Sequence, residues 1–242
     1  MEESKPYQTF SLIYDSVMAH IHFEDWAEFI LTSLPYTPKS VLDLACGTGT
    51  LLGEFLEIPE KVGLDRSEEM IRVGKTKFPF IEFTLNDLRK FNLNRKFDLI
   101  TCTHDSINYL NDMYELEDHF RSVYKHLEIN GYYFFDISSE FNLEKNFNNK
   151  TFKEKHGEFS LIWKNFYDPL KRKIISTLEF ERIENEEKKK FLETHVQKFF
   201  SNTEILTVAK KSGLELVKIG SDYKNWSNKN NSSLINYLFI KN

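Results

Sequence analysis

The stretch that most constrains the fold of this chain runs from Val41 to Thr50 and reads VLDLACGTGT. Its first residues are mostly apolar and suit a strand that is buried on both faces of a parallel sheet. Gly47 and Gly49 then allow a tight turn and a close approach of the backbone to a ligand. A helical pattern follows, and it directs free N–H groups and a positive helix dipole at whatever lies above the strand. We therefore expect an α/β fold with a nucleotide-like ligand at this turn.

Two cofactor classes compete for the turn. The dinucleotide fingerprint G-x-G-x-x-G needs a small residue where this chain has Leu52, and Gly53 comes one position too late. Asp43 in the strand needs a partner if it is buried, and its charge would favour a cationic ligand group over a pyrophosphate. The stretch resembles motif I of the class I S-adenosylmethionine-dependent methyltransferases, in which an acidic residue precedes G-x-G.

Two carboxylates follow later strands. Asp65 stands 18 residues after Gly47, at the end of a predicted strand over residues 61–65, where a carboxylate can accept hydrogen bonds from both ribose hydroxyls. A third predicted strand, over residues 80–85, leads into Asp87 and Leu88, which are placed to meet the adenine amino group and a ring nitrogen. An ordinary Asn-Asp turn is the alternative for that site. Both carboxylates indicate adenosine.

Further resemblance surrounds the turn. After a predicted strand over residues 97–102, the string D-S-I-N-Y-L from Asp105 to Leu110 resembles motif IV of the small-molecule methyltransferases of this superfamily. Tyr14-Asp15-x-x-Met18 resembles their Y-D-x-x-M element, whose tyrosine lies over the cofactor, although a plain amphipathic helix would show the same spacing. The motifs of enzymes that methylate adenine, glutamine or cytosine C5 are absent from the sequence at motif IV.

The resemblance implies a set of site residues. Ala45, Gly47 and Gly49 would contact the methionine moiety, Asp65 the ribose, and Asp87 with Leu88 the adenine. Other expected neighbours of the cofactor are Tyr14, Arg66, Met70, Thr103 and His104, of which Met70 could equally be plain core. If the acceptor arrives protonated, the candidate bases are His104, Asp105 and His195, although an exposed or hydrogen-bonded structural histidine also explains His195. No metal site is expected.

The element order predicts one domain with an insertion. Residues 1–140 and 201–242 suit a doubly wound, Rossmann-like sheet of seven strands with an antiparallel edge. Residues 141–200 instead show alternating strands with turns at residues 168–171 and 185–188, which predicts an inserted antiparallel β cap. In its last strand His195 lies on one face with Glu193 and Gln197, opposite Leu192, Thr194, Val196 and Phe200. Such a cap would enclose a small acceptor.

Composition narrows the partners and the compartment. The net charge is −5 and no basic stripe is present, so nucleic acid is not an expected partner. The cysteines, Cys46 and Cys102, indicate a reduced, cytoplasmic protein. Neither a signal peptide nor an apolar run of about 18 residues appears, so we expect no membrane association. A homodimer remains open.

These observations predict an S-adenosylmethionine-dependent methyltransferase that moves a methyl group to nitrogen or oxygen of a small molecule by in-line displacement and releases S-adenosylhomocysteine. The nearest resemblance is to sugar amine N-methyltransferases. The alternatives are a non-catalytic S-adenosylmethionine-binding or regulatory protein and a nicotinamide-dependent oxidoreductase.

Overall fold

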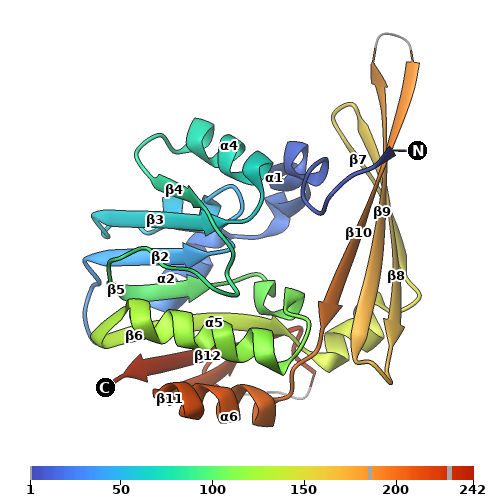
Figure 1. Ribbon diagram of the computed structural model, residues 1–242. Helices are drawn as coiled ribbons and strands as arrows, with labels where there is room; N and C mark the ends of the chain where they lie inside the picture. Colours follow the sequence, from blue (N-terminus) through green and yellow to red (C-terminus); the bar gives the residue numbers. More distant parts are fainter. Residues whose placement is uncertain (1, 185–186, 228–230) are drawn as a thin grey trace.

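A computed structural model describes residues 2–184, 187–227 and 231–242, which form two sheets (Figure 1). The strands of the larger sheet are β2 (Ser40–Leu44), β3 (Glu60–Asp65), β4 (Glu82–Leu85), β5 (Phe97–Cys102), β6 (Leu127–Ser138), β11 (Leu214–Ser221) and β12 (Leu234–Lys241). Their order is β11-β12-β6-β5-β2-β3-β4. Neighbours from β6 to β4 run parallel, while β12 is antiparallel to both β6 and β11. The predicted Rossmann-like sheet with an antiparallel edge is therefore confirmed.

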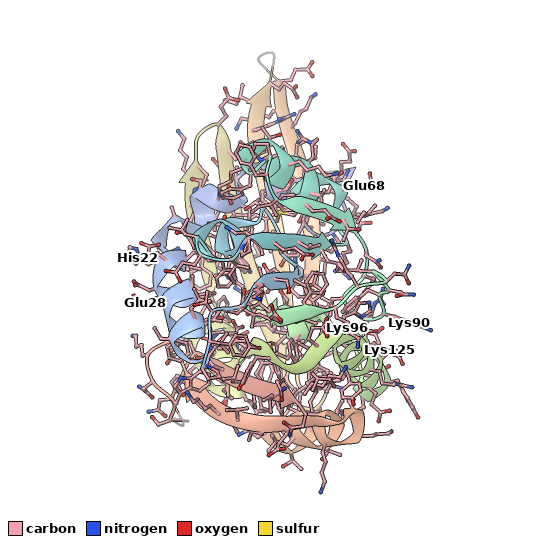
Figure 2. All side chains as sticks on the ribbon, turned by 90° about the vertical axis from the view of Figure 1, so that its left-hand side faces the viewer. His22, Glu28, Glu68, Lys90, Lys96 and Lys125 are labelled. Atoms are coloured by element: carbon pink, nitrogen blue, oxygen red, sulfur yellow. The ribbon has the colours of Figure 1, made fainter. Side chains whose placement is uncertain are left out.

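Helices cover both faces of the larger sheet. One face packs against α2 (Phe23–Thr32) and α3 (Thr50–Glu54), and the other against α5 (Met113–His126) and α6 (Asn202–Ser212). Figure 2 shows this layering, with Glu28 of α2 and the preceding His22 on one side and Lys90, Lys96 and Lys125 on the other. Because both faces are covered, every residue of β2 is buried. The remaining helices are η1 (Phe10–Leu12), α1 (Tyr14–Val17), η2 (Met18–His20), α4 (Glu68–Lys77), η3 (Ser106–Tyr109) and η4 (Asn142–Phe147).

The structure corrects the bounds of one predicted strand. β4 begins at Glu82 rather than at residue 80, because Phe78 to Ile81 forms a turn in which the Ile81 N–H donates to the Phe78 carbonyl. Phe80 lies outside the sheet and its side chain is 99% exposed. The apolar character of residues 80 and 81 therefore led to a predicted strand that is two residues too long.

The smaller sheet stands at one end of the larger one (Figure 1). Its strands are β7 (Thr151–His156), β8 (Phe159–Asp168), β9 (Lys173–Glu184), β10 (Glu187–Lys198) and β1 (Glu2–Glu3), in the order β1-β10-β9-β8-β7. The antiparallel hairpins from β7 to β10 lie within the predicted insertion, whereas β1 comes from the amino terminus and pairs parallel with β10. Asn185 and Glu186, half of the predicted second turn, lie outside the described residues.

None of the helices in the described ranges combines the length and the apolar character that a membrane crossing needs.

Candidate active site

The glycine-rich turn between β2 and α3 has a left-handed backbone. Ala45, Gly47 and Gly49 have φ angles of 53°, 55° and 77°. At Gly49 a Cβ atom would lie 2.7 Å from the Phe83 ring, so no larger residue fits without displacing that ring. Gly49 is therefore required by both the backbone angle and the packing, and it holds the start of α3 close to the carboxyl end of β2.

Asp65 ends β3 and ties two turns together. Its buried carboxylate accepts the N–H of Gly47 at 2.8 Å and the N–H of Ser67 at 2.8 Å. Burial raises the pKa of Asp65, and these two N–H donors partly oppose the rise. The side chain thus lies beside the glycine turn, where the sequence places the ribose contact.

Asp43 has the partner that its burial requires. Thr101 on the neighbouring strand β5 donates its hydroxyl to Asp43 Oδ1 at 2.7 Å. Burial raises the pKa of Asp43 to about 7, although the Thr101 hydrogen bond acts in the opposite direction. The carboxylate lies directly below the turn, and a cation bound nearby would favour its ionised form.

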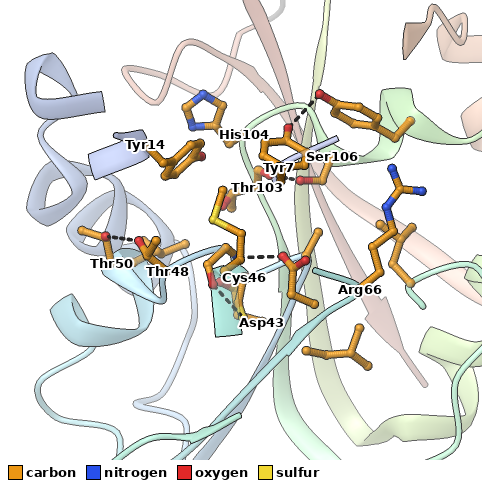
Figure 3. A pocket seen from close by; sticks show the side chains of 18 of the residues that line it. Tyr7, Tyr14, Asp43, Cys46, Thr48, Thr50, Arg66, Thr103, His104 and Ser106 are labelled. Carbon is orange, nitrogen blue, oxygen red and sulfur yellow. Dashed lines mark hydrogen bonds between the residues drawn. The ribbon is translucent and has the colours of Figure 1, made fainter. Parts of the chain in front are cut away.

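These elements enclose a cavity of about 920 Å³ at the carboxyl ends of β2 to β5 (Figure 3). The predicted cofactor residues on its wall are Tyr14, Ala45, Gly47, Asp65, Arg66, Met70, Asp87, Leu88, Thr103 and His104. Gly49 packs against Phe83 and is not on the wall. The wall also contains Tyr7, which no local signal singles out, and Ser106 and Tyr109, which belong to the motif IV string.

Asp87 lies on the wall beside a cation. The Arg89 guanidinium donates from Nε to Oδ2 at 3.0 Å and from Nη2 to the same oxygen at 2.5 Å. Burial alone would raise the pKa of Asp87, but the Arg89 hydrogen bonds lower it below its usual value. Asp87 therefore remains an ionised acceptor near neutral pH.

The turn after β5 is held in an unusual conformation. His104 and Asp105 have φ angles of 58° and 50°, which non-glycine residues rarely adopt. Asp136 on β6 fixes both, because its carboxylate accepts their backbone N–H groups and the hydroxyl of Tyr223. This anchoring presents the His104 ring to the cavity (Figure 3).

His104 is a poor base in this position. Its Nδ1 atom is buried without a hydrogen-bond partner among the described residues. Burial, assisted by the nearby His20, lowers the pKa of His104 to about 4, so the ring is neutral at pH 7. His104 therefore lines the cavity as a neutral ring.

A second cavity, of about 620 Å³, adjoins the first. Tyr7, Tyr14, His104 and Tyr109 line both cavities. The other walls come largely from η4 and the smaller sheet and include Leu143, Phe147, Trp163, Ser176, His195 and Gln197. The predicted bases Asp105 and His195 both line this second cavity, whereas of the three only His104 also reaches the first.

Asp105 is an unusual acid in the second cavity. Gln197 donates to its Oδ1 at 2.8 Å. Burial first, and then the nearby Asp136 carboxylate, raise the pKa of Asp105 to about 8. The group is therefore mostly protonated at pH 7.

On β10 the polar face points inward. Glu193 and His195 are buried, with exposed fractions of 0% and 5%, while Thr194 and Val196 on the opposite face are exposed. Alternation along the strand is as predicted, but β10 ends at Lys198, so Phe200 leaves that face and packs into the core of the larger sheet. His195 is a buried, hydrogen-bonded histidine at the edge of a cavity.

The geometry fits an adenosine-containing ligand. A left-handed glycine turn, a buried carboxylate at the end of the second strand and an ionised acceptor at the end of the third lie on one cavity. Three or more side chains that could share a metal ion are not grouped anywhere in the described ranges.

Comparisons with known proteins agree with this geometry. A family described as "Methyltransferase domain" matches residues 41–131. YqeM, a proposed methyltransferase of Bacillus subtilis (strain 168), is 32% identical over 222 residues, which cover 90% of each chain. The dTDP-3-amino-3,4,6-trideoxy-α-D-glucopyranose N,N-dimethyltransferase of Streptomyces venezuelae is 35% identical over 108 residues, which cover 44% of this chain and 45% of the relative.

A solved structure shows the same fold over the whole chain. The S-adenosylmethionine-dependent methyltransferase of Clostridium acetobutylicum ATCC 824 superposes with a TM-score of 0.85 and 29% identity, covering 97% of this chain and 98% of that one. Both sheets are therefore shared with that enzyme. Its motifs, its fold and these relatives together show that the chain belongs to the class I S-adenosylmethionine-dependent methyltransferases.

Proposed function

We propose that this methyltransferase transfers the methyl group to an amine nitrogen of a small molecule that is held in the second cavity. The observation that carries the proposal is the wall shared by the two cavities, which consists of Tyr7, Tyr14, His104 and Tyr109. A cofactor in the first cavity and an acceptor in the second would meet at this wall. The residues 141–200 would then act as a cap on the acceptor side.

On the cofactor side, we assign the adenosine to the strand ends. Asp65 would accept the ribose hydroxyls, and Asp87 with Leu88 would bind the adenine, bordered by Arg66 and Met70. Ala45 and Gly47 would contact the methionine moiety, with Gly49 shaping the turn. Thr103, His104 and Tyr14 lie where this cavity meets or approaches the second one, so they would surround the reactive sulfur.

When bound, S-adenosylmethionine supplies a methyl group that its positively charged sulfur already activates. The task left to the protein is to hold the acceptor nitrogen in line, at roughly 3 Å, and to exclude water. The aromatic rings of Tyr7, Tyr14 and Tyr109 at the shared wall suit both needs, since they are rigid and largely apolar.

An amine is favoured over a hydroxyl by the polar groups of the second cavity. Asp105 and Gln197 can both accept hydrogen bonds from an amine or ammonium group. Relatives of the chain include N,N-dimethyltransferases of dTDP-amino sugars, such as the Streptomyces venezuelae protein. A nitrogen acceptor also needs weaker activation than a hydroxyl, because a neutral amine is already nucleophilic.

Methyl transfer from radiolabelled S-adenosylmethionine tests the proposal. The probes are dTDP-3-amino-3,6-dideoxyglucose and the matching sugar with a hydroxyl in place of the amine, with product mass confirming the methylated atom. We expect label on the amino sugar only. Label on the hydroxyl sugar alone, or on neither sugar while S-adenosylhomocysteine binds tightly, would contradict an amino-sugar acceptor.

A further inference from the structure

Four polar side chains form an unbroken hydrogen-bonded row at the wall between the cavities. Tyr7 donates its hydroxyl to the Tyr109 hydroxyl at 2.7 Å, and the Tyr109 oxygen lies 2.8 Å from His195 Nδ1. His195 Nε2 in turn lies 3.0 Å from Glu193 Oε2. Tyr7, Tyr109 and His195 line the second cavity, while Glu193 lies behind them with no exposed surface.

The contacts of Glu193 fix the direction in which the hydrogen bonds of the row donate. Glu193 also accepts the backbone N–H groups of Tyr7, Thr9 and Phe10 at 2.8, 2.5 and 3.0 Å, so its carboxylate acts only as an acceptor. A neutral His195 ring must then donate from Nε2 and accept at Nδ1. Tyr109 consequently donates to His195 and accepts from Tyr7, which leaves the Tyr7 oxygen free to accept a hydrogen bond from the acceptor amine.

The surroundings keep both phenols of the row neutral. Burial raises the pKa of both Tyr7 and Tyr109, so each hydroxyl stays protonated and can pass a proton on only by receiving another. Charged groups near the phenols are the Asp105 and Asp65 carboxyls and the Arg66 guanidinium, which lies 5.8 Å from the Tyr109 ring. The rings of Tyr7 and Phe10 pack on His195, and Glu193 is the charge that directly contacts it.

We propose that Tyr7, Tyr109 and His195 carry the proton of the acceptor amine away from the reaction site, with Glu193 as a positioning residue that orients His195. This inference rests on the proposed function. The nitrogen binds the methyl carbon as the carbon–sulfur bond breaks, and that electron pair stays on sulfur. The nitrogen proton passes to Tyr7, the Tyr7 proton to Tyr109 and the Tyr109 proton to His195 Nδ1, from which it reaches solvent after product release.

The tautomer of His195 tests the direction of the row without any acceptor. Two-bond proton–nitrogen NMR of the histidine-labelled protein saturated with S-adenosylhomocysteine reports it, and the missing signal of His195→Gln provides the assignment. We expect the neutral ring to carry its proton on Nε2, and Tyr109→Phe to shift the Nδ1 signal because the hydrogen bond from the phenol is lost. A ring protonated on Nδ1, or an Nδ1 signal that is unchanged in Tyr109→Phe, would overturn the relay.

The pH dependence of turnover tests whether the row carries the proton during catalysis. The substrate is the amino sugar that the protein methylates. In the wild-type protein kcat should rise with pH, because the relay ends at a ring nitrogen that must be free to take the proton. Tyr109→Phe should lower kcat about 100-fold while KM changes less than threefold. His195→Gln should also remove that pH limb. If Tyr109→Phe raises KM instead and leaves kcat intact, the row is only structural.

Glu154 and His156 on β7 provide a matched control. They repeat the Glu-x-His pair, with His156 Nε2 2.8 Å from Glu154 Oε2, but they line neither cavity. We expect His156→Gln to keep the wild-type rate and pH profile. Absence of turnover in the wild-type protein would refute the proposed acceptor, whereas turnover that is insensitive to Tyr109→Phe would refute the relay alone.

Discussion

The two cavities differ in the distance along the chain between the residues that build them. The first is formed by turns that follow successive strands, such as the Asp65 hydrogen bond to Gly47, 18 residues apart. The second depends on contacts between distant segments, since Tyr7 reaches Tyr109 across 102 residues and Glu193 across 186. Turns at successive strand ends therefore specify the strand-end wall of the first cavity, whereas only the tertiary fold specifies the second cavity.

Asp43→Asn should give the largest effect, a change in the pH dependence of stability. It tests whether burying the Asp43 carboxylate at the first cavity costs stability when the group is ionised. The folded-state pKa of Asp43 is raised from 3.8 to about 7, so the folded protein holds this proton more tightly than the unfolded chain does. The stability from Asp43 is therefore complete below about pH 4 and is lost as pH rises toward 7, by at most about 4 kcal/mol. Asparagine can still accept from Thr101.

Urea unfolding of both proteins at pH 5 and pH 8 measures this effect. We expect the free energy of unfolding of the variant to increase relative to that of the wild-type protein as pH rises. Equal pH dependence of the two proteins would show that Asp43 is ionised in the folded state at little cost.

Asp65→Ala should weaken binding of S-adenosylhomocysteine about 100-fold, since hydrogen bonds to a charged carboxylate contribute about 1.5–3 kcal/mol each. Calorimetric titration provides the measurement. Asp98→Ala is the matched control, because Asp98 also accepts two backbone N–H groups, those of Lys39 and Ser40, at the opposite end of the sheet. An equal loss of affinity in both variants would show that the effect is only structural.

Gly49→Ala should destabilise the protein by about 2 kcal/mol more than Gly157→Ala does. Both glycines have positive φ, so both substitutions carry backbone strain of about 1 kcal/mol. At Gly49 the new Cβ also meets the Phe83 ring, whereas nothing lies within 4 Å of it at Gly157. Thermal unfolding of the two variants compares them, and equal melting temperatures would mean that Phe83 moves aside freely.

Trp163→Ala should have the smallest effect, an increase of about tenfold in KM for the amino sugar with less than a twofold change in affinity for S-adenosylhomocysteine. Trp163 lines the second cavity only. Phe166→Ala is the control, because Phe166 lies on the other face of β8 and is 54% exposed. A loss of cofactor affinity in Trp163→Ala would mean that the two cavities do not act separately.

Sequence patterns predicted the larger sheet well, because alternation of strands and helices and the spacing of Gly47, Asp65 and Asp87 are local features. The strand β5 was predicted with its observed ends. The predictions failed or ended where contacts between distant segments determine the structure. Among the described residues, Glu2 and Glu3 of β1 pair with Phe191 and Leu192 of β10, and this pairing has no sequence signature. The same is true of the place of Tyr7 on both cavities.

The orientation of β10 shows the limit most clearly. Alternation separates Glu193 and His195 from Thr194 and Val196, but it does not say which face is buried. The polar face is buried because the amino-terminal segment supplies three N–H donors to Glu193. A buried polar face is stable only with such partners, and these partners are remote in sequence.

Hydrogen–deuterium exchange of the wild-type protein, free and saturated with S-adenosylhomocysteine, tests most directly whether the first cavity binds the cofactor by itself. We expect strong protection in peptides that cover residues 43–50, 63–70 and 85–90, and little change over β8 and β9. Protection confined to β8 and β9, with none at the glycine turn, would contradict the assignment of the cofactor to the first cavity.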